Sequence, residues 1–292
     1  MITRILIFSI VFAIITIIVI AVIVLYEGNK FSQKQERDSW SIKTKYNEII
    51  TFKWCDLSSK EVFEKRFQAV GEVFANAFSS LYLEEGLEGF FKNNPTSGFS
   101  LLERKILLHL YKRDSVDIID AEEREIALKF MQANKNELLK YSKEFFLNEW
   151  NDEKTIKIIQ ELSNKNKVLV AFRDKKPIGF ALFSDAAVIG WDGFLKGGLG
   201  LDENEKFLWI LAIDPSAQKR GLARILTFSI LKLFPNVDTI KLKTDISVDP
   251  LTGKPKNENA CRLYGHFGFK RYDEQGLVYD QKAYQFFVWR KK

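Results

Sequence analysis

Two segments of this 292-residue sequence carry residues whose types and spacing suit chemistry on an anionic ligand. In the first, an apolar run typical of a buried strand ends at Pro215, and the basic turn Gln218-Lys-Arg-Gly-Leu-Ala223 follows it. A helical pattern over residues 222–234 begins inside this turn. The free N–H groups and the positive end of that helix can hold a pyrophosphate, so the segment predicts an anion cradle.

The second segment, Asn257-Glu-Asn-Ala-Cys-Arg-Leu-Tyr-Gly-His-Phe-Gly-Phe269, predicts a helix that ends at a tyrosine and a glycine. In this order the two segments resemble the Q/R-x-x-G-x-G/A turn and the next motif, N-x-x-A-x-x-L-Y-x-x-x-G-F, of the GNAT N-acetyltransferase superfamily. The resemblance is specific over residues 206–272. It implies an α+β fold with a mixed, mostly antiparallel sheet flanked by helices, and transfer of an acetyl group from acetyl-CoA to an amine.

The resemblance also implies roles for single residues. A strand would pair with the pantetheine arm of acetyl-CoA where it separates from its neighbour, and the turn after it would hold the pyrophosphate. Tyr264 matches the tyrosine near the sulfur, and a phenol of pKa about 10 can protonate the departing thiolate as general acid. Ala223 stands where many members have a second glycine. The implied cofactor-binding residues are Leu211, Ala212, Ile213, Gln218, Lys219, Arg220, Gly221, Leu222, Ala223 and Asn257.

The sequence leaves the general base open. Many members carry a glutamate on the cofactor strand, but Leu208, Trp209 and Ile210 supply none here. Glu205 just before the strand and Asp245 at the end of a later strand are the candidate substitutes. Each is equally well explained as a solvated charge at a strand end, and a water chain or an acceptor that arrives neutral would need no carboxylate.

The N-terminus predicts a membrane anchor over residues 1–27. Residues 5–25 include no charged residue, and 21 residues at about 1.5 Å each span roughly 31 Å, the thickness of a bilayer core. A cleaved signal peptide is the competing interpretation, but the apolar run is long and no small-x-small cleavage site follows it. Lysines and arginines are more frequent after the span than before it, which predicts that the C-terminal domain is cytoplasmic.

Residues 28–44 predict a stalk, and residues 45–292 an acetyltransferase-like domain. Alternation predicts a strand at residues 49–55, and the apolar stripe of residues 62–81 predicts a core helix. Glycines and Pro95 predict a loop over residues 86–98, and residues 100–165 predict a helical insertion. Residues 167–172 and 177–183 predict a hairpin, and the glycine-rich residues 185–205 a surface loop.

Composition narrows the class of partner. The net charge is +6, but basic residues alternate with acidic ones, so we expect no nucleic-acid partner. Two cysteines and two histidines predict reduced thiols and no metal site. The expected acceptor is an amine on a small molecule or a protein. A catalytically weak acyl-CoA sensor and a membrane-tethered scaffold are the alternative functions.

Overall fold

A computed structural model describes residues 39–57, 60–94, 107, 121–162, 167–185, 201–247, 255–272 and 284–291. The predicted membrane span at residues 5–25 and most of the glycine-rich segment lie outside these ranges. Within them, no helix is both long and apolar enough to span a bilayer.

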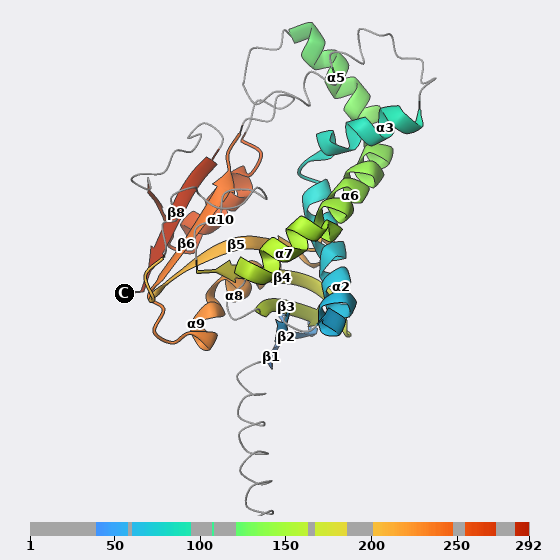
Figure 1. Cartoon of the computed structure of the whole chain (residues 1–292). Coiled ribbons are helices and arrows are strands. Elements are labelled where there is room, and N and C mark those ends of the chain that lie inside the picture. The colour runs from blue at the N-terminus through green and yellow to red at the C-terminus, as the bar shows by residue number, and fades with distance from the viewer. Residues whose placement is uncertain are drawn as a thin grey trace, which may run out of the picture.

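One eight-stranded sheet forms the centre of the fold, in the order β1-β2-β3-β4-β5-β6-β8-β7 (Figure 1). All neighbouring pairs are antiparallel except β5 and β6, which are parallel. The predicted α+β fold with a mixed, mostly antiparallel sheet is therefore confirmed. The strands are β1 Ser39–Lys43, β2 Ile49–Asp56, β3 Lys167–Arg173, β4 Lys176–Ser184, β5 Glu205–Ile213, β6 Thr239–Asp245, β7 Lys270–Tyr272 and β8 Tyr284–Arg290.

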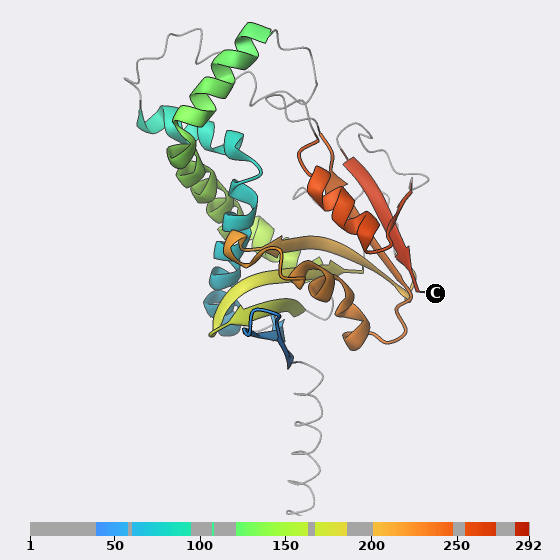
Figure 2. The same cartoon turned by 180° about the vertical axis from the view of Figure 1, so that it is seen from behind.

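Helices cover both faces of the sheet (Figures 1 and 2). On one face, Phe74, Trp150 and Phe180 pack in a core cluster that joins α2 and α6 to β4. On the other face, Leu222 and Tyr264 belong to a second cluster. The helices of the first face are α2 Lys60–Ser79, α6 Lys135–Asn151 and α7 Glu153–Leu162, and those of the second are α8 Leu222–Phe228, α9 Ile230–Leu233 and α10 Glu258–His266.

A third cluster of apolar residues lies away from the sheet. It joins α3 Leu87–Asn93, α5 Ala121–Ala133 and the first half of α6 through residues such as Phe90, Phe130 and Leu138. We call this unit the arm, and it projects from the sheet in both views (Figures 1 and 2). The second half of α6, with Phe146 and Trp150, packs on the sheet. The helices predicted as one insertion therefore divide between the arm and the main core.

Two expectations about local structure are wrong, and both failures have a packing reason. The predicted loop at residues 86–98 begins with a helix, α3, directly after the 3-10 turn η1 Leu83–Gly86. A Cβ on Gly86 would lie 2.3 Å from the carbonyl oxygen of Leu138, so this glycine allows close contact with α6. The predicted stalk includes β1, because Trp40 stacks on Phe52 of β2 at 5.3 Å between ring centroids.

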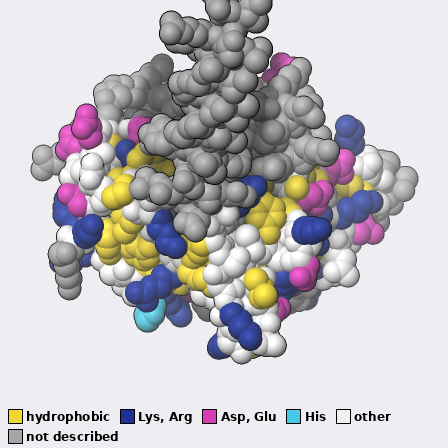
Figure 3. All heavy atoms as spheres, turned by 90° about the horizontal axis from the view of Figure 1, so that it is seen from below, with side chains coloured by type: hydrophobic (Ala, Val, Ile, Leu, Met, Phe, Trp, Pro, Cys, Tyr) yellow, Lys and Arg dark blue, Asp and Glu magenta, His cyan; other side chains and the backbone are white. Residues whose placement is uncertain are grey.

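The predicted hairpin is confirmed as β3 and β4, with Asp174 and Lys175 at positive φ in its turn. Basic and acidic side chains are interspersed on the face seen in Figure 3, as the sequence pattern indicates.

Candidate active site

The parallel strands β5 and β6 diverge halfway along β5. Their register runs from Glu205 opposite Thr239 to Leu208 opposite Leu242 and then ends. Beyond that point, among the strands that the structure describes, β5 pairs only with β4 on its other side, and β6 only with β8. The edge of β5 that faces β6 thus has main-chain groups open to an extended ligand.

A β-bulge lies at this divergence. Leu182 pairs with Ile210, whereas the next residue, Phe183, pairs with Leu208, so Trp209 is the extra residue on β5. A bulge bends a strand and re-aims its main-chain groups, and bulges are frequent beside active sites. The bulge and the divergence together place reorientated N–H groups where the two strands separate.

The turn after β5 contains the segment predicted as an anion cradle, residues 218–223, and we call residues 214–223 the cradle. Asp214 begins the 3-10 turn η3 Pro215–Ala217, and its carboxylate accepts hydrogen bonds from the N–H of Ser216 at 3.0 Å and from Nδ2 of Asn76 at 2.9 Å. Lys219 and Gly221 both have positive φ, at 61° and 78°. No atom lies within 4 Å of a Cβ built on Gly221, so the space in front of this turn is open. The structure therefore places the first N–H groups of α8 beside open space.

The side chain of Arg220 is held by the β1–β2 hairpin. Its guanidinium forms an ion pair with Glu48 and lies 5.3 Å from the ring centroid of Tyr46. Glu48 also contacts Arg173 at 3.4 Å. The guanidinium of Arg220 is therefore already paired. The part of the cradle that stays open to a ligand is its main chain.

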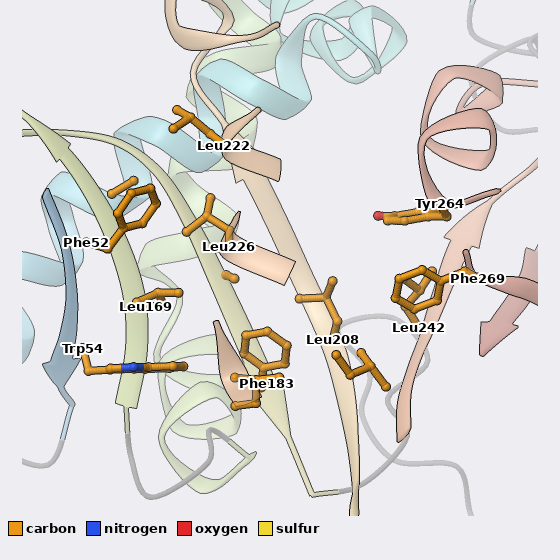
Figure 4. Close-up of a cluster of buried hydrophobic side chains, with 14 of the residues drawn as sticks. Phe52, Trp54, Leu169, Phe183, Leu208, Leu222, Leu226, Leu242, Tyr264 and Phe269 are labelled. Atoms are coloured by element: carbon orange, nitrogen blue, oxygen red, sulfur yellow. The ribbon is translucent and has the colours of Figure 1, made fainter. Parts of the chain in front are cut away.

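Tyr264 lies across the divergence from the cradle. It is 8% exposed on α10, and its ring contacts Phe269 and Phe287. Its hydroxyl points from α10 toward β5 (Figure 4). Burial raises the pKa of this phenol above its ordinary value, so the hydroxyl is protonated at neutral pH. Cys261, one turn earlier on α10, is a free thiol whose pKa is also raised by burial.

Asp245 and Asn257 are joined by hydrogen bonds to Tyr82, a residue that the sequence analysis did not single out. The Tyr82 hydroxyl donates to Oδ2 of Asp245 at 3.1 Å and accepts from Nδ2 of Asn257 at 3.2 Å. The N–H of Ser247 donates to the other carboxylate oxygen of Asp245 at 2.8 Å. Burial, and then the charge of Asp245, raise the pKa of Tyr82 well above its ordinary value. The only sequence signal for Tyr82 was its place after an aromatic helix.

Glu205, the other candidate base, lies at the opposite end of β5 from the cradle. Its carboxylate forms an ion pair with Nζ of Lys241 at 3.0 Å. The structure does not bring Glu205 to the divergence, since about four residues at roughly 3.3 Å each separate it from the bulge.

The model of the acetyltransferase (GNAT) family matches residues 135–269. These residues form a GNAT acetyltransferase domain. Members of this family transfer acyl groups from acetyl-CoA, so residues 135–269 form an acyltransferase domain. A search of curated protein sequences found no match.

Solved structures show distant similarity. PaiA N-acetyltransferase from Thermoplasma acidophilum, solved with coenzyme A, is 16% identical over 82% of this chain and 98% of its own, with a TM-score of 0.39. PH1933 from Pyrococcus horikoshii OT3 is 17% identical over 61% and 97%, with a TM-score of 0.35. The ribosomal-protein-S18-alanine N-acetyltransferase from Escherichia coli is 19% identical over 48% and 76%, with a TM-score of 0.32.

The sheet and core that contain the matched residues extend beyond them. β2 and α2 precede the match and β8 follows it, yet all three pack into the same sheet and core. Tyr82, which binds Asp245, also precedes the match. In the part of the GNAT domain that the structure describes, no group of three His, Cys, Asp or Glu side chains could hold a metal ion.

Proposed function

We propose that the protein is an N-acetyltransferase that transfers the acetyl group of acetyl-CoA directly to an amine in a ternary complex. One observation carries the proposal: an open glycine turn at the end of β5 and a buried tyrosine on α10 flank the point where β5 and β6 diverge. The cradle would hold the pyrophosphate, and the β5 edge over Leu211–Ile213 would pair with the pantetheine arm. This arrangement would bring the thioester to the bulge.

The reaction then needs stabilised charge and a proton. As the amine attacks the carbonyl carbon, negative charge grows on the carbonyl oxygen, and a main-chain N–H at the bulge would bind it. The C–S bond breaks and Tyr264 donates its proton to the departing sulfur. The phenol is protonated at neutral pH, and because burial makes it a weaker acid in the free protein, its proton has to move as the C–S bond breaks.

The test is a pair of measurements on the full chain in detergent micelles. Calorimetry with acetyl-CoA measures binding, and thiol release measures transfer to a panel of amines: spermidine, lysine, glucosamine and an alanine-terminated peptide. Tyr264→Phe is expected to lower kcat by about 100-fold with unchanged binding. Tyr141→Phe, on the arm, is the matched control. Binding without transfer to any amine would make the protein a sensor, and a folded protein without binding would make it a scaffold.

We also propose that residues 5–25 anchor the enzyme in a membrane, with the GNAT domain in the cytoplasm. The charge-free run and the basic residues after it support this arrangement. The protein should stay with membranes during alkaline carbonate extraction, and a variant that starts at residue 31 should not. Release of the full chain by carbonate would contradict the anchor.

A further inference from the structure

Lys243 is the first residue of β6 beyond the divergence. The last β5–β6 pair is Leu208 with Leu242, so the next position of β6 is no longer covered by β5. Leu242 packs in the core cluster with Tyr264. Because side chains alternate along a strand, Lys243 projects from the opposite face, where the Asp245–Tyr82 bond also lies. We call this the acceptor face, since the cradle helix α8 covers the other one.

The amine of Lys243 is half-buried and has an aromatic partner. Its Nζ lies 4.1 Å from the ring centroid of Tyr284 on β8. It forms no ion pair with any carboxylate among the described residues, unlike Lys241 on the same strand face, which is bound to Glu205. Among the described residues, the charge that acts on it is that of Asp245, which is bonded to Tyr82 and to the main chain of residue 247 and also interacts with Lys256. Lys241 lies two residues earlier on the same face of β6.

This environment makes the amine of Lys243 easier to deprotonate than that of an ordinary lysine. Burial lowers the pKa of Lys243 to about 8, although the nearby Asp245 opposes the shift. A lysine tuned to this range by burial is well matched to general-base catalysis near neutral pH. The remaining candidates are less suitable, because Glu205 is distant and Asp245 is already bonded to Tyr82.

We propose that Lys243 is the general base of the reaction and removes a proton from the acceptor ammonium on the acceptor face. The inference rests on the proposed N-acetyltransferase function and adds the proton acceptor to it. It also sets the substrate class: the acceptor is an alkyl amine that arrives protonated. The flexible four-carbon stem of lysine lets Nζ move from Tyr284 to an acceptor beside the divergence.

The proton balance is complete without a further reactant. The neutral Nζ of Lys243 takes one proton from R–NH3⁺, and the resulting R–NH2 attacks the thioester carbon. The C–N bond forms and the C–S bond breaks as Tyr264 protonates the sulfur. The new amide nitrogen releases its extra proton to solvent, which reprotonates Tyr264, and Lys243 returns its proton to solvent. Base and acid thus act from opposite faces of the sheet.

The experiment compares the full-length wild type with Lys243→Met and Lys243→Arg, using the panel amine that the wild type acetylates fastest. Both variants are expected to lose about 100-fold or more in kcat/KM while acetyl-CoA binding stays unchanged. Arginine remains protonated, so it can replace a cationic anchor but not a base. Lys241→Met, on the same strand face, is the matched control and should keep transfer within about threefold.

The pH profile separates a base from a structural lysine. Wild-type kcat/KM should rise to a plateau above about pH 8, and exchange of the acceptor for one with another amine pKa should not move this midpoint. In Lys243→Met, the midpoint should move to the pKa of the acceptor amine, near 10 for an alkyl amine. A wild-type midpoint that follows the acceptor, or full activity in Lys243→Arg, would overturn the proposal.

A second readout needs no turnover. Trace labelling with acetic anhydride, read by mass spectrometry, should modify Lys243 half-maximally near pH 8, well below an ordinary lysine. Labelling of Lys243 only near pH 10 would also overturn the proposal. If the wild type binds acetyl-CoA but acetylates no amine, the proposed function fails and the base assignment fails with it. If the wild type is active and Lys243→Met equally so, only the base assignment fails.

Discussion

The cradle and the acceptor face meet at the same divergence of β5 and β6, yet they are built in different ways. The cradle is one continuous stretch of chain whose positive-φ residues Lys219 and Gly221 shape its main chain. The acceptor face is assembled from side chains far apart in sequence, since Tyr82 binds Asp245 across 163 residues and Asn257 across 175. A main-chain site thus depends on local conformation, whereas a side-chain site depends on the whole fold.

The largest expected effect is at the cradle glycine. Gly221→Trp should weaken acetyl-CoA binding by at least about 100-fold, or about 2.7 kcal/mol. The indole would fill the open space, and a φ of 78° also costs an L-residue about 1–2 kcal/mol. Calorimetry on the full chain measures it. Gly265→Trp on α10, where a side chain also meets open space, should leave the dissociation constant within about threefold. Equal losses in the two variants would mean that the cradle does not bind the donor.

The next largest effect is expected at Tyr82, whose hydroxyl joins Asp245 to Asn257. Tyr82→Phe leaves Asp245 and Asn257 each without one partner, and a lost buried hydrogen bond costs about 1–3 kcal/mol. Thiol-release kinetics should show kcat/KM reduced by about tenfold, with acetyl-CoA binding unchanged. Tyr141→Phe serves as control. A loss of donor binding in Tyr82→Phe would contradict the separation of the two faces.

A smaller effect is expected from the cap of the cradle. Burial raises the pKa of Asp214, but hydrogen bonds from Ser216 and Asn76 outweigh it, and the net shift is downward. Asp214→Ala should lower the free energy of unfolding by about 1 kcal/mol at pH 7. Because the pKa of Asp214 is lower in the folded than in the unfolded protein, its carboxylate stabilises the fold at pH values above the unfolded-state pKa near 3.9. This stabilisation is lost as the pH falls through the folded-state pKa. Urea unfolding should therefore show the variant and the wild type converging below about pH 4. A gap that widens in acid would reverse the sign of this linkage.

The smallest effect should come from a charge beside the cradle. Glu48→Gln frees Arg220 and removes a negative charge, so acetyl-CoA should bind more tightly, by less than about threefold. The gain should disappear at about 1 M salt, where screening extends over roughly 3 Å. Calorimetry at the two salt concentrations, with Glu88→Gln as a distant control, measures the difference. A tenfold change would show that side chains, and not the main chain, dominate donor binding.

The difference between the two regions also explains what the sequence could predict. The strand, turn and helix around Gly221 are encoded by consecutive residues, so their order and nearly their bounds were predictable. The same holds for the hairpin of β3 and β4, whose pattern alternates around a polar turn. Strand pairing between distant segments was not predictable, and β1 was therefore assigned to a stalk.

Glycines show the limit most clearly. Gly221 faces open space and Gly86 faces the main chain of α6. In the sequence, however, both are simply glycines between two predicted elements. Only the fold shows that the missing side chain leaves open space at Gly221 and allows close contact with α6 at Gly86. The network of Tyr82 and Asp245, and the uncovered position of Lys243, likewise depend on which strands stop pairing.

The long separation of Tyr82 from Asp245 has a consequence during synthesis. At about 5–20 residues per second, a ribosome needs roughly 8 to 33 seconds to add the 163 residues between them. In the first part of that interval α2 has been made, while β4, on which its aromatic side chains pack, has not. The nascent chain therefore exposes Phe74 and its neighbours for seconds, and a chaperone that binds aromatic segments would find its target here before the enzyme has an acceptor face.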